Sequence, residues 1–339
     1  MKIYTNHELN EYIKDNISDT WEERDFVAYA RKYFHGRQDK IMAIGGLRGT
    51  GKTTGLLQAV NGLNACYITA QQKEEETADD YIDFIRNTDA KYIIIDEYSW
   101  INNREELDKY LYTAVQNGKR IAITGTESIT LEYLNYNTLI HRVDMVHVTM
   151  FTYEEHCRLY HMEPSKKNRE DYLLNGGLFS EYAVTNYETM QNYIKTAIID
   201  NLAAYMGSRM SKEKAAALVY SVLYKAICPN NLSTVPELAK NQLSVENFLS
   251  EMGIDTQIEF SDKDVRNVAD IFEQIGLIVR MPNYDKTSPI KEQYYITNPS
   301  LSCQLILAAY NIKEISSDIL IQLFEAIQPA YKNQKRYNI

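Results

Sequence analysis

The residue types that could do chemistry gather first in a glycine-rich stretch near residue 50. Gly46, Gly51, Lys52 and Thr53 fit the spacing Gly-x-x-x-x-Gly-Lys-Thr. Glycines let backbone N–H groups approach phosphate oxygens, a lysine supplies charge for the β- and γ-phosphates, and a threonine hydroxyl is a ligand for Mg²⁺. An apolar run, 41–44, precedes the stretch and a helical run follows it, which is the context that this pattern requires. The sequence therefore predicts a loop that binds nucleotide phosphates.

The expected ligand of this loop is ATP together with Mg²⁺. The N-terminal end of the helix that follows would add its partial positive charge to the backbone N–H groups. Side chains and backbone of the whole stretch are therefore candidates for binding. The predicted nucleotide-binding residues are Gly46, Arg48, Gly49, Thr50, Gly51, Lys52, Thr53 and Thr54.

Two carboxylates follow a second apolar run. Asp96 and Glu97 come directly after residues 92–95, and Asp96 lies 44 residues after Lys52. At the end of a buried strand, Asp96 would help to hold Mg²⁺ through water, and Glu97 could polarise the attacking water. Thr53 and Asp96 are thus the predicted metal site, and Glu97 is the predicted catalytic base. Both motifs together predict ATP hydrolysis.

Three further residues could act on the γ-phosphate, and each has a second interpretation. Thr124 and Thr126 flank a glycine at the end of a fourth apolar run. Their hydroxyls could contact the γ-phosphate or the water, or they could simply satisfy a turn. Arg142, directly before a fifth apolar run, could reach the γ-phosphate of a neighbouring subunit as an arginine finger. It could equally be a surface arginine or one that pairs with a helix.

Apolar runs that alternate with amphipathic stretches must position these residues. Alternating strands and helices predict an α/β fold, with a parallel sheet covered by helices on both faces and ligands at the carboxyl ends of the strands. Amphipathic helices are expected earlier, at 5–16 and 20–36. The second, with Trp21 and Phe26 on its apolar face, would pack beside the sheet or line a pocket for the base. The expected strands are 41–45, 65–69, 91–96, 120–124 and 143–149, with helices near 52–61, 77–87, 103–116 and 127–136.

The second half of the chain predicts helices followed by a hairpin. Three helices and a hairpin are the elements of a winged helix-turn-helix, which suggests DNA. The helix Asp262–Gln274 nevertheless has a net charge of −2, and DNA affinity depends largely on cations. We therefore favour a winged helix that docks on protein, and weak contact with nucleic acid stays open. The expected helices are 152–204, 213–228, 234–240 and 261–274, and the expected hairpin strands are 277–281 and 293–297.

Length and composition restrict the class of protein and its location. The chain has 339 residues, a length typical of two domains, and a net charge of −10 that gives no support for nucleic-acid binding. Its four cysteines are scattered without zinc-ligand spacing, which indicates free thiols in a reducing compartment. No signal-peptide pattern begins the chain, and no apolar run approaches the ~20 residues that span a bilayer. The expectation is a cytoplasmic protein that does not contact a membrane.

Together these motifs resemble those of the AAA+ superfamily of ATPases, over roughly residues 36–310. The resemblance is to prokaryotic members related to the archaeal ATPases and the origin-recognition group, in which a winged-helix region follows the ATPase core. Residues 46–53 are similar to the superfamily's Walker A motif, 93–97 to its Walker B motif, 123–126 to its sensor-1 region and 141–143 to the segment with the finger arginine. Residues 175–179 resemble a double-glycine turn in the lid.

This resemblance implies a division of the chain and a way of working. The implied parts are an ATPase core at 1–150, a helical lid at 151–204, a winged-helix-like domain at 205–310 and a C-terminal helix and tail at 311–339. It implies hydrolysis coupled to conformational change or to assembly with a protein partner, and a homo-oligomer in the ATP state. The alternative is a signalling or defence switch, or a DNA-associated regulator, with little turnover. No nuclease-like constellation follows the hairpin, and no sensor-2 arginine lies near Gly176.

Overall fold

The computed structural model describes residues 1–18, 20–37, 39–70, 76–125, 131, 139–227, 241–282, 292–321 and 324–325. They divide into two compact units, with the boundary between Val148 and Thr149. The short segment Leu47–Thr50 groups with the second unit. Each unit has hydrophobic clusters of its own. None of the described helices is both long and apolar enough to cross a membrane.

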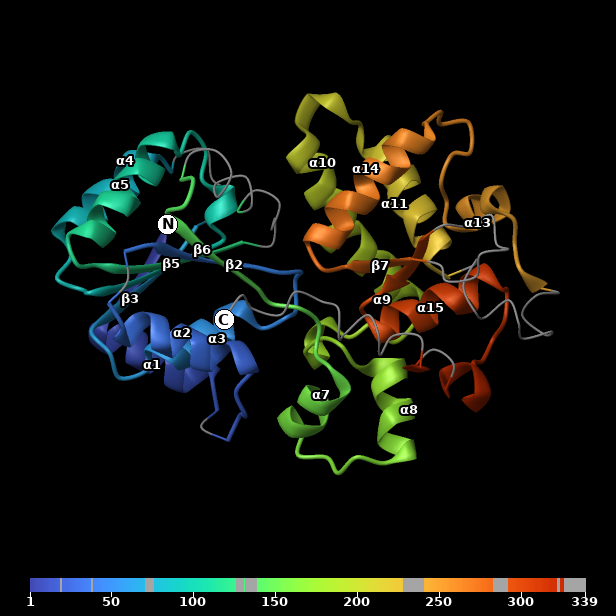
Figure 1. The fold of residues 1–339 in the computed structure, drawn as a ribbon, viewed down its shortest axis with the longest axis horizontal. Helices are drawn as coiled ribbons and strands as arrows, with labels where there is room; N and C mark the ends of the chain where they lie inside the picture. The colour runs from blue at the N-terminus through green and yellow to red at the C-terminus, as the bar shows by residue number, and fades with distance from the viewer. Residues whose placement is uncertain are drawn as a thin grey trace. The chain divides into compact units, whose positions relative to one another are not determined.

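The first unit contains a six-stranded sheet in the order β1-β3-β4-β5-β2-β6 (Figure 1). Five strands are parallel, and β1 joins the edge antiparallel to β3, with Lys2 opposite Thr69. The strand β2, from which the phosphate loop emerges, lies between β5 and β6. The strands are β1 (Lys2–Thr5), β2 (Ile41–Gly45), β3 (Ala65–Thr69), β4 (Tyr92–Asp96), β5 (Arg120–Gly125) and β6 (Val143–His147).

Helices cover both faces of this sheet, as Figure 1 shows. Side chains alternate between the faces along each strand. On β2, Met42 and Ile44 therefore pack with α1, α2 and α3, whereas Ile41 and Ala43 pack with α4 and α5. The helices are α1 (Asn6–Asn16), α2 (Asp25–His35), α3 (Lys52–Val60), α4 (Ala78–Asn87) and α5 (Glu105–Gln116), with a 3₁₀ turn at Tyr98–Trp100.

The predicted α/β architecture of the first unit is confirmed, with two corrections. A purely parallel sheet was wrong at the edge, because the short strand β1 pairs antiparallel. The helix expected from residue 20 begins only at Asp25, whose carboxylate suits the positive end of a helix. Trp21, expected on its buried face, lies before the helix and is 49% exposed. The helix expected at 127–136 falls outside the described residues, apart from Leu131.

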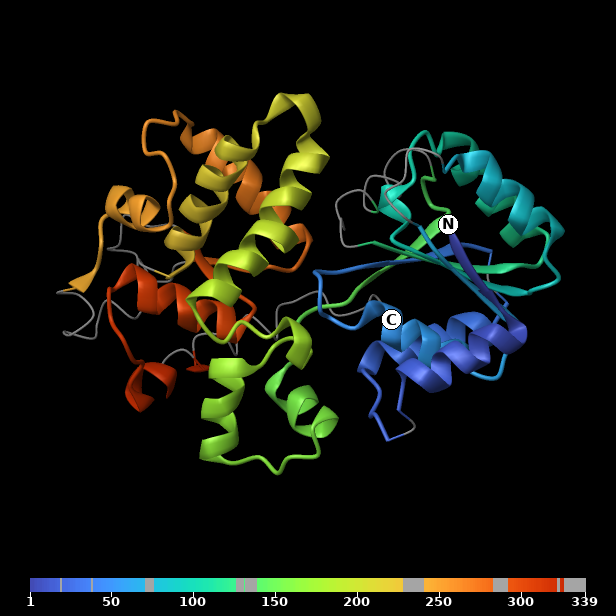
Figure 2. The same ribbon diagram turned by 180° about the vertical axis from the view of Figure 1, so that it is seen from behind.

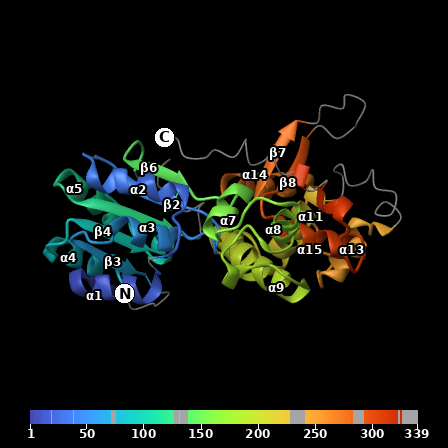
Figure 3. The same ribbon diagram turned by 90° about the horizontal axis from the view of Figure 1, so that it is seen from below.

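The second unit is helical, with one two-stranded sheet. The helix expected at 213–228 is α11, and the predicted hairpin forms from β7 and β8, which pair antiparallel (Figure 3). The helix expected at 234–240 lies outside the described residues. The elements are α7 (Tyr153–Leu159), α8 (Lys166–Asn175), α9 (Tyr187–Tyr193), a π-helix η3 (Ile194–Ile199), α10 (Asp200–Met206), α11 (Lys212–Ile227), α13 (Val245–Glu251), α14 (Asp262–Gln274), β7 (Ile278–Pro282), β8 (Glu292–Ile296) and α15 (Pro299–Ala309), with 3₁₀ turns at Ser180–Tyr182 and Gly207–Arg209.

One hydrophobic cluster runs through the whole of the second unit. It joins side chains from α7 and α8 to side chains from α11, α14 and α15. The helices α9 and α10 and the π-helix between them form one continuous run, seen in yellow-green in Figure 2. Ser261 caps α14 by accepting a hydrogen bond from the N–H of Asp264, as its sequence predicts.

Candidate nucleotide-binding site

The phosphate loop connects β2 to α3. Gly51 directly precedes the helix with a φ of +79°, a conformation that glycine adopts without strain. Lys52 is the first residue of α3 and is only 6% exposed. Its Nζ donates a hydrogen bond to the carbonyl of Gly46 at 2.7 Å, so the ammonium lies across the base of the loop. Strand, loop and helix are therefore arranged as the motif predicts.

Asp96, at the end of β4, accepts hydrogen bonds from hydroxyls on three other elements. Thr53 of α3 donates to Oδ2 at 2.8 Å, and Tyr67 of β3 donates to the same oxygen at 2.8 Å. Thr124 of β5 donates to Oδ1. The backbone N–H of Glu97 also donates to Oδ1, at 3.1 Å. A carboxylate that is only 6% exposed is thereby fixed in position by four donors.

The residues around Asp96 fit a magnesium ion. Mg²⁺ takes oxygen ligands and keeps several waters, so it needs one or two protein oxygens beside phosphate oxygens. The Thr53 hydroxyl and the Asp96 carboxylate, 2.8 Å apart, are oxygens of this kind. The two predicted metal ligands thus lie together, although they are 43 residues apart in the chain.

Glu97, the predicted base, follows Asp96 in a constrained turn. Its φ of +54° and ψ of +39° lie in the left-handed region. For a residue with a Cβ this conformation costs about 1–2 kcal/mol, and such residues cluster at active sites. The side chain is half-buried. Glu97 directly follows Asp96, the carboxylate that accepts from Thr53.

Of the two threonines predicted as γ-phosphate sensors, the structure describes Thr124 alone. Thr124 is fully buried and donates its hydroxyl proton to Asp96. This contact makes it a positioning residue for the carboxylate, and its role as a sensor stays a prediction. Thr126 lies outside the described residues.

The tip of the loop, Leu47–Thr50, groups with the second unit and is held there through its backbone. The Tyr193 hydroxyl donates to the carbonyl of Arg48 at 3.2 Å, and the N–H of Phe179 donates to the carbonyl of Gly49 at 3.1 Å. A trans peptide places its C=O and N–H on opposite sides. The N–H groups that follow these carbonyls, those of Gly49 and Thr50, therefore point away from Tyr193 and Phe179.

The side chains at the tip are engaged within the second unit. The Thr50 hydroxyl donates to the carbonyl of Leu47 at 2.8 Å, so the part of Thr50 that could bind phosphate is its backbone N–H. The guanidinium of Arg48 lies 5.6 Å from the centre of the Tyr182 ring. A Cβ on Gly49 would come within 2.6 Å of Tyr182, so glycine is required here. Thr54 lies half-buried in the first turn of α3.

Arg142 lies beside the start of β2, at the opposite end of that strand from the phosphate loop. Its carbonyl accepts from the N–H of Ile41, at the start of β2, whereas the loop follows the end of that strand. Five strand residues span about 16 Å. Its exposed guanidinium lies 4.4 Å from the centre of the Tyr112 ring. Arg142 is therefore too distant to contact a phosphate bound at its own loop.

The sequence did not predict the contact of Tyr67 with Asp96, nor the contacts of Phe179 and Tyr193 with the loop tip. Tyr67 looks like one apolar residue of a strand, and its reach to Asp96 depends on β3 being the neighbour of β4. Burial raises the pKa of Tyr67 first, and the nearby charge of Asp96 raises it further, so the phenol stays a proton donor. No local spacing signals these partners.

Comparison with known proteins agrees with this geometry. A family model described as an AAA domain matches residues 38–157. This part of the chain, about a third of its length, is therefore similar to an AAA domain. The match includes the phosphate loop, Asp96, Glu97, Thr124 and Arg142. No curated protein matches the sequence.

The solved structures to which the chain is similar include three proteins at low identity. Saccharomyces cerevisiae Hsp104 in complex with casein has a TM-score of 0.39 and 10% identity, with 69% of this chain and 51% of that chain covered. Aeropyrum pernix ORC1 in complex with DNA has a TM-score of 0.29 and 10% identity, with 83% of this chain and 90% of that chain covered. Thermotoga maritima RuvB, a Holliday junction branch migration motor, has a TM-score of 0.27 and 12% identity, with 99% of this chain and 96% of that chain covered. The chain thus spans about half the length of Hsp104.

Proposed function

We propose that this protein is an AAA+-type ATPase that couples Mg-ATP binding and hydrolysis to conformational change or to assembly with a protein partner. The observation that carries the proposal is the Asp96 carboxylate, which accepts from the Thr53 hydroxyl of the phosphate-binding helix and adjoins Glu97. A loop that only bound phosphate would not need a buried carboxylate at this place. The AAA domain match over 38–157 supports the same activity.

The proposed mechanism assigns a separate task to each residue. Bound Mg²⁺ would neutralise charge on the β- and γ-phosphates. Lys52 would turn its ammonium from the Gly46 carbonyl to phosphate oxygens, and Thr53 and Asp96 would hold the metal shell. Glu97 would accept a hydrogen bond from the attacking water and orient it. Tyr67 and Thr124 would keep the Asp96 carboxylate in place.

The proposal includes a homo-oligomer in the ATP state. Arg142 is exposed and lies at the opposite end of the strands from its own phosphate loop, which supports a role in a neighbouring subunit. An arginine finger supplied in trans stabilises charge in the transition state. In this proposal the protein works in the cytoplasm, a location that suits the buried free thiols Cys66, Cys157 and Cys303.

We further infer that residues 205–310, which include α11, α14 and the β7–β8 hairpin, form a winged-helix-like domain that docks on protein. Among its cations, Arg280 pairs with Asp270 at 2.6 Å and with Glu273 at 2.5 Å. Lys214 of α11 lies 3.6 Å from Asp264. Cations already paired within the protein contribute less to phosphate binding, which argues against a DNA reader.

The Glu97→Gln variant tests the proposed base. The amide keeps the size of the side chain but cannot act as a carboxylate base. We expect ATP binding to be retained and hydrolysis to fall at least 100-fold, within the range that general-base catalysis contributes. Phosphate release and the anisotropy of a fluorescent ATP analogue measure the two effects separately.

Two variants control this experiment. Glu105→Gln neutralises an exposed carboxylate at the start of α5 and should hydrolyse ATP at the wild-type rate. Lys52→Ala should lose nucleotide binding itself. Wild-type turnover in Glu97→Gln would contradict the assignment of the base. Tight ATP binding without phosphate release by the wild type would instead favour a nucleotide-dependent switch.

A further inference from the structure

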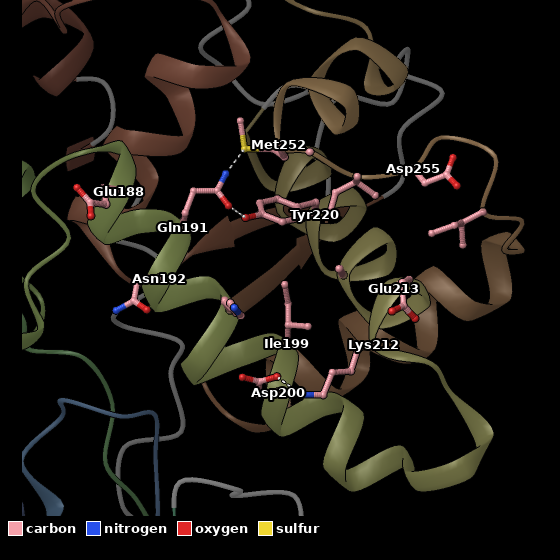
Figure 4. Close-up of a pocket in the computed structure, with 15 residues that line it drawn as sticks. Glu188, Gln191, Asn192, Ile199, Asp200, Lys212, Glu213, Tyr220, Met252 and Asp255 are labelled. Carbon is pink, nitrogen blue, oxygen red and sulfur yellow. Dashed lines mark hydrogen bonds and ion pairs between the residues drawn. The ribbon is translucent and has the colours of Figure 1, made fainter.

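A groove with a volume of about 620 Å³ lies in the second unit (Figure 4). Its walls are α9 and the π-helix on one side and α11 on the other, and the residues that follow α13 close one end. We call it the α9–α11 groove. Its volume is within the range of about 300–1,000 Å³ that is typical of ligand sites. None of its lining residues belongs to the nucleotide site.

The floor of the groove is apolar, and its polar groups already have partners. The Tyr220 hydroxyl donates to Oε1 of Gln191 at 2.7 Å. The amide of Gln191 donates to the sulfur of Met252 at 3.3 Å and to the Tyr187 hydroxyl at 3.0 Å. Both amide hydrogens are therefore used, and Figure 4 shows the contacts with Tyr220 and Met252. What the floor offers a ligand is apolar surface, with Ile199 and Met252 among its residues.

One wall of the groove has an unusual backbone. Ile194–Ile199 is a π-helix within the run from α9 to α10. π-helices are rare and occur frequently at functional sites. This one contributes both Lys195 and Ile199 to the groove. The backbone departs from α-helical geometry where the chain lines the groove. This observation is independent of the volume and the charge of the groove.

The rim of the groove is acidic. It carries four carboxylates and two ammonium groups, a net charge of −2. Asp200 and Lys212 pair with each other at 2.9 Å, so three carboxylates remain against one ammonium (Figure 4). Hydrogen bonds to its own backbone N–H and to the Ser211 hydroxyl hold the pKa of Glu213 below its usual value. The charged residues are Glu188, Lys195, Asp200, Lys212, Glu213 and Asp255.

We propose that the α9–α11 groove binds a short segment of a protein partner that has two or three apolar side chains flanked by lysine or arginine. Apolar side chains would cover the floor, where desolvated anchors contribute most of the binding energy. Basic flanks would lie against the acidic rim, which raises the rate of association and selects against acidic partners. The inference rests on the proposed function in one respect: the occupant is the protein partner proposed above.

The test uses the full chain and two labelled 15-residue peptides, one of leucine and lysine and one of leucine and glutamate in the same order. Fluorescence anisotropy without nucleotide should give micromolar binding of the leucine–lysine peptide, weakened by salt, and at least tenfold weaker binding of the other. Because no nucleotide is present, the groove can fail this test while the ATPase stands. An inactive ATPase would equally leave a positive peptide result intact.

Three variants locate the binding. Ala216→Trp places an indole on the half-buried floor position of α11 and should weaken the leucine–lysine peptide at least tenfold. Glu188→Lys combined with Glu213→Lys changes exposed residues only, so it should fold normally and reverse the preference between the peptides. Glu163→Lys makes the same change at an exposed position outside the groove and should bind as the wild type does. Far-UV circular dichroism checks the fold of each.

Two results would overturn the proposal. The first is that the leucine–lysine peptide does not bind, or binds the groove variants and the wild type equally. The second is that the chain self-associates with rising concentration and that Ala216→Trp abolishes this association. The groove would then bind a second copy of the chain in place of a partner's segment.

Discussion

At the scale of single residues, the proposed metal and phosphate site depends on the position of the Asp96 carboxylate. Its donors come from α3, β3 and β5, so the carboxylate connects three elements that are distant in sequence. Removing one donor takes away one of the hydrogen bonds to a buried carboxylate, and a hydrogen bond to a charged group contributes about 1.5–3 kcal/mol. The effect of replacing a donor on the free energy of unfolding therefore measures how much that donor helps to hold the carboxylate.

We predict that Thr124→Val lowers the free energy of unfolding by about 1.5–3 kcal/mol, the contribution of a hydrogen bond to a charged group. The side chain keeps its branched shape but loses the hydroxyl that donates to Asp96. Urea denaturation followed by circular dichroism measures the change. Thr113→Val is the matched control, since its hydroxyl donates to the carbonyl of Lys109 on the exposed side of α5. Equal urea midpoints for both variants would contradict the role of Thr124.

The residues of the site divide according to how local their signal is. Lys52 and Asp96 could be predicted, because a glycine-rich spacing and a strand end are features of neighbouring residues. Tyr67 could not, because its contact with Asp96 requires the strand order. Phe179 and Tyr193 contact the loop tip from more than 120 residues away in the chain. Phe179 donates its backbone N–H and Tyr193 its hydroxyl, and both acceptors are backbone carbonyls, which residue type does not reveal.

At the scale of elements, the strands were predicted well because buried parallel strands are continuous apolar runs bounded by polar residues. The edge strand β1 was missed because four residues are too few to show a period of two. Helix α14 was predicted at both ends, since Ser261 and Asp264 form a capping box and Gly276 follows its last turn. Helix α2 was expected to begin too early, because apolar Trp21 extended the pattern beyond the true start at Asp25.

The packing of α2 against α3 depends on one glycine. A Cβ on Gly55 would lie 2.2 Å from Cζ of Phe26, which is fully buried. We predict that Gly55→Ala destabilises the protein by about 1–3 kcal/mol, the usual effect of overpacking, although alanine is the better helix former. The effect is read as a lower urea midpoint.

A double variant shows whether the Phe26 ring is the cause. In a Phe26→Leu background the ring tip is absent, so Gly55→Ala should cost less there by about 0.5–3 kcal/mol, the range for residues in contact. If Gly55→Ala cost the same in both backgrounds, the close approach of α2 and α3 would not explain the glycine.

At the scale of the whole molecule, each of the two units has hydrophobic clusters of its own, so the two units can unfold separately. Cys66 lies in a cluster of the first unit, whereas Cys157 and Cys303 share the cluster of the second. Burial raises the pKa of Cys66 and of Cys303 to about 12 each. At pH 8 the reactive thiolate is then about 10⁻⁴ of each thiol, so alkylation should require unfolding. Cys66 therefore reports on a core of the first unit, and Cys303 reports on the core of the second.

We predict that iodoacetamide labels none of these three thiols in the native protein, and that each reacts as its core opens along a urea series. Mass spectrometry of the separated peptides gives a midpoint for each cysteine. Mg-ATP at about 100 times its Kd stabilises a binding unit by about 2.7 kcal/mol, so the midpoint of Cys66 should rise. Lys52→Ala, without phosphate binding, should abolish this rise. A rise that persisted in Lys52→Ala would place the nucleotide elsewhere.

The same series tests the division of the second half into a lid and a winged helix. Cys157 belongs to α7, within the predicted lid, and Cys303 belongs to α15, within the predicted winged-helix region. The structure joins their surroundings in one cluster, in which the sulfur of Cys303 donates to the carbonyl of Leu173 of α8 at 3.2 Å. A shared core unfolds cooperatively, so both thiols should react at the same urea concentration. Separate midpoints would mean that the lid unfolds as an independent domain.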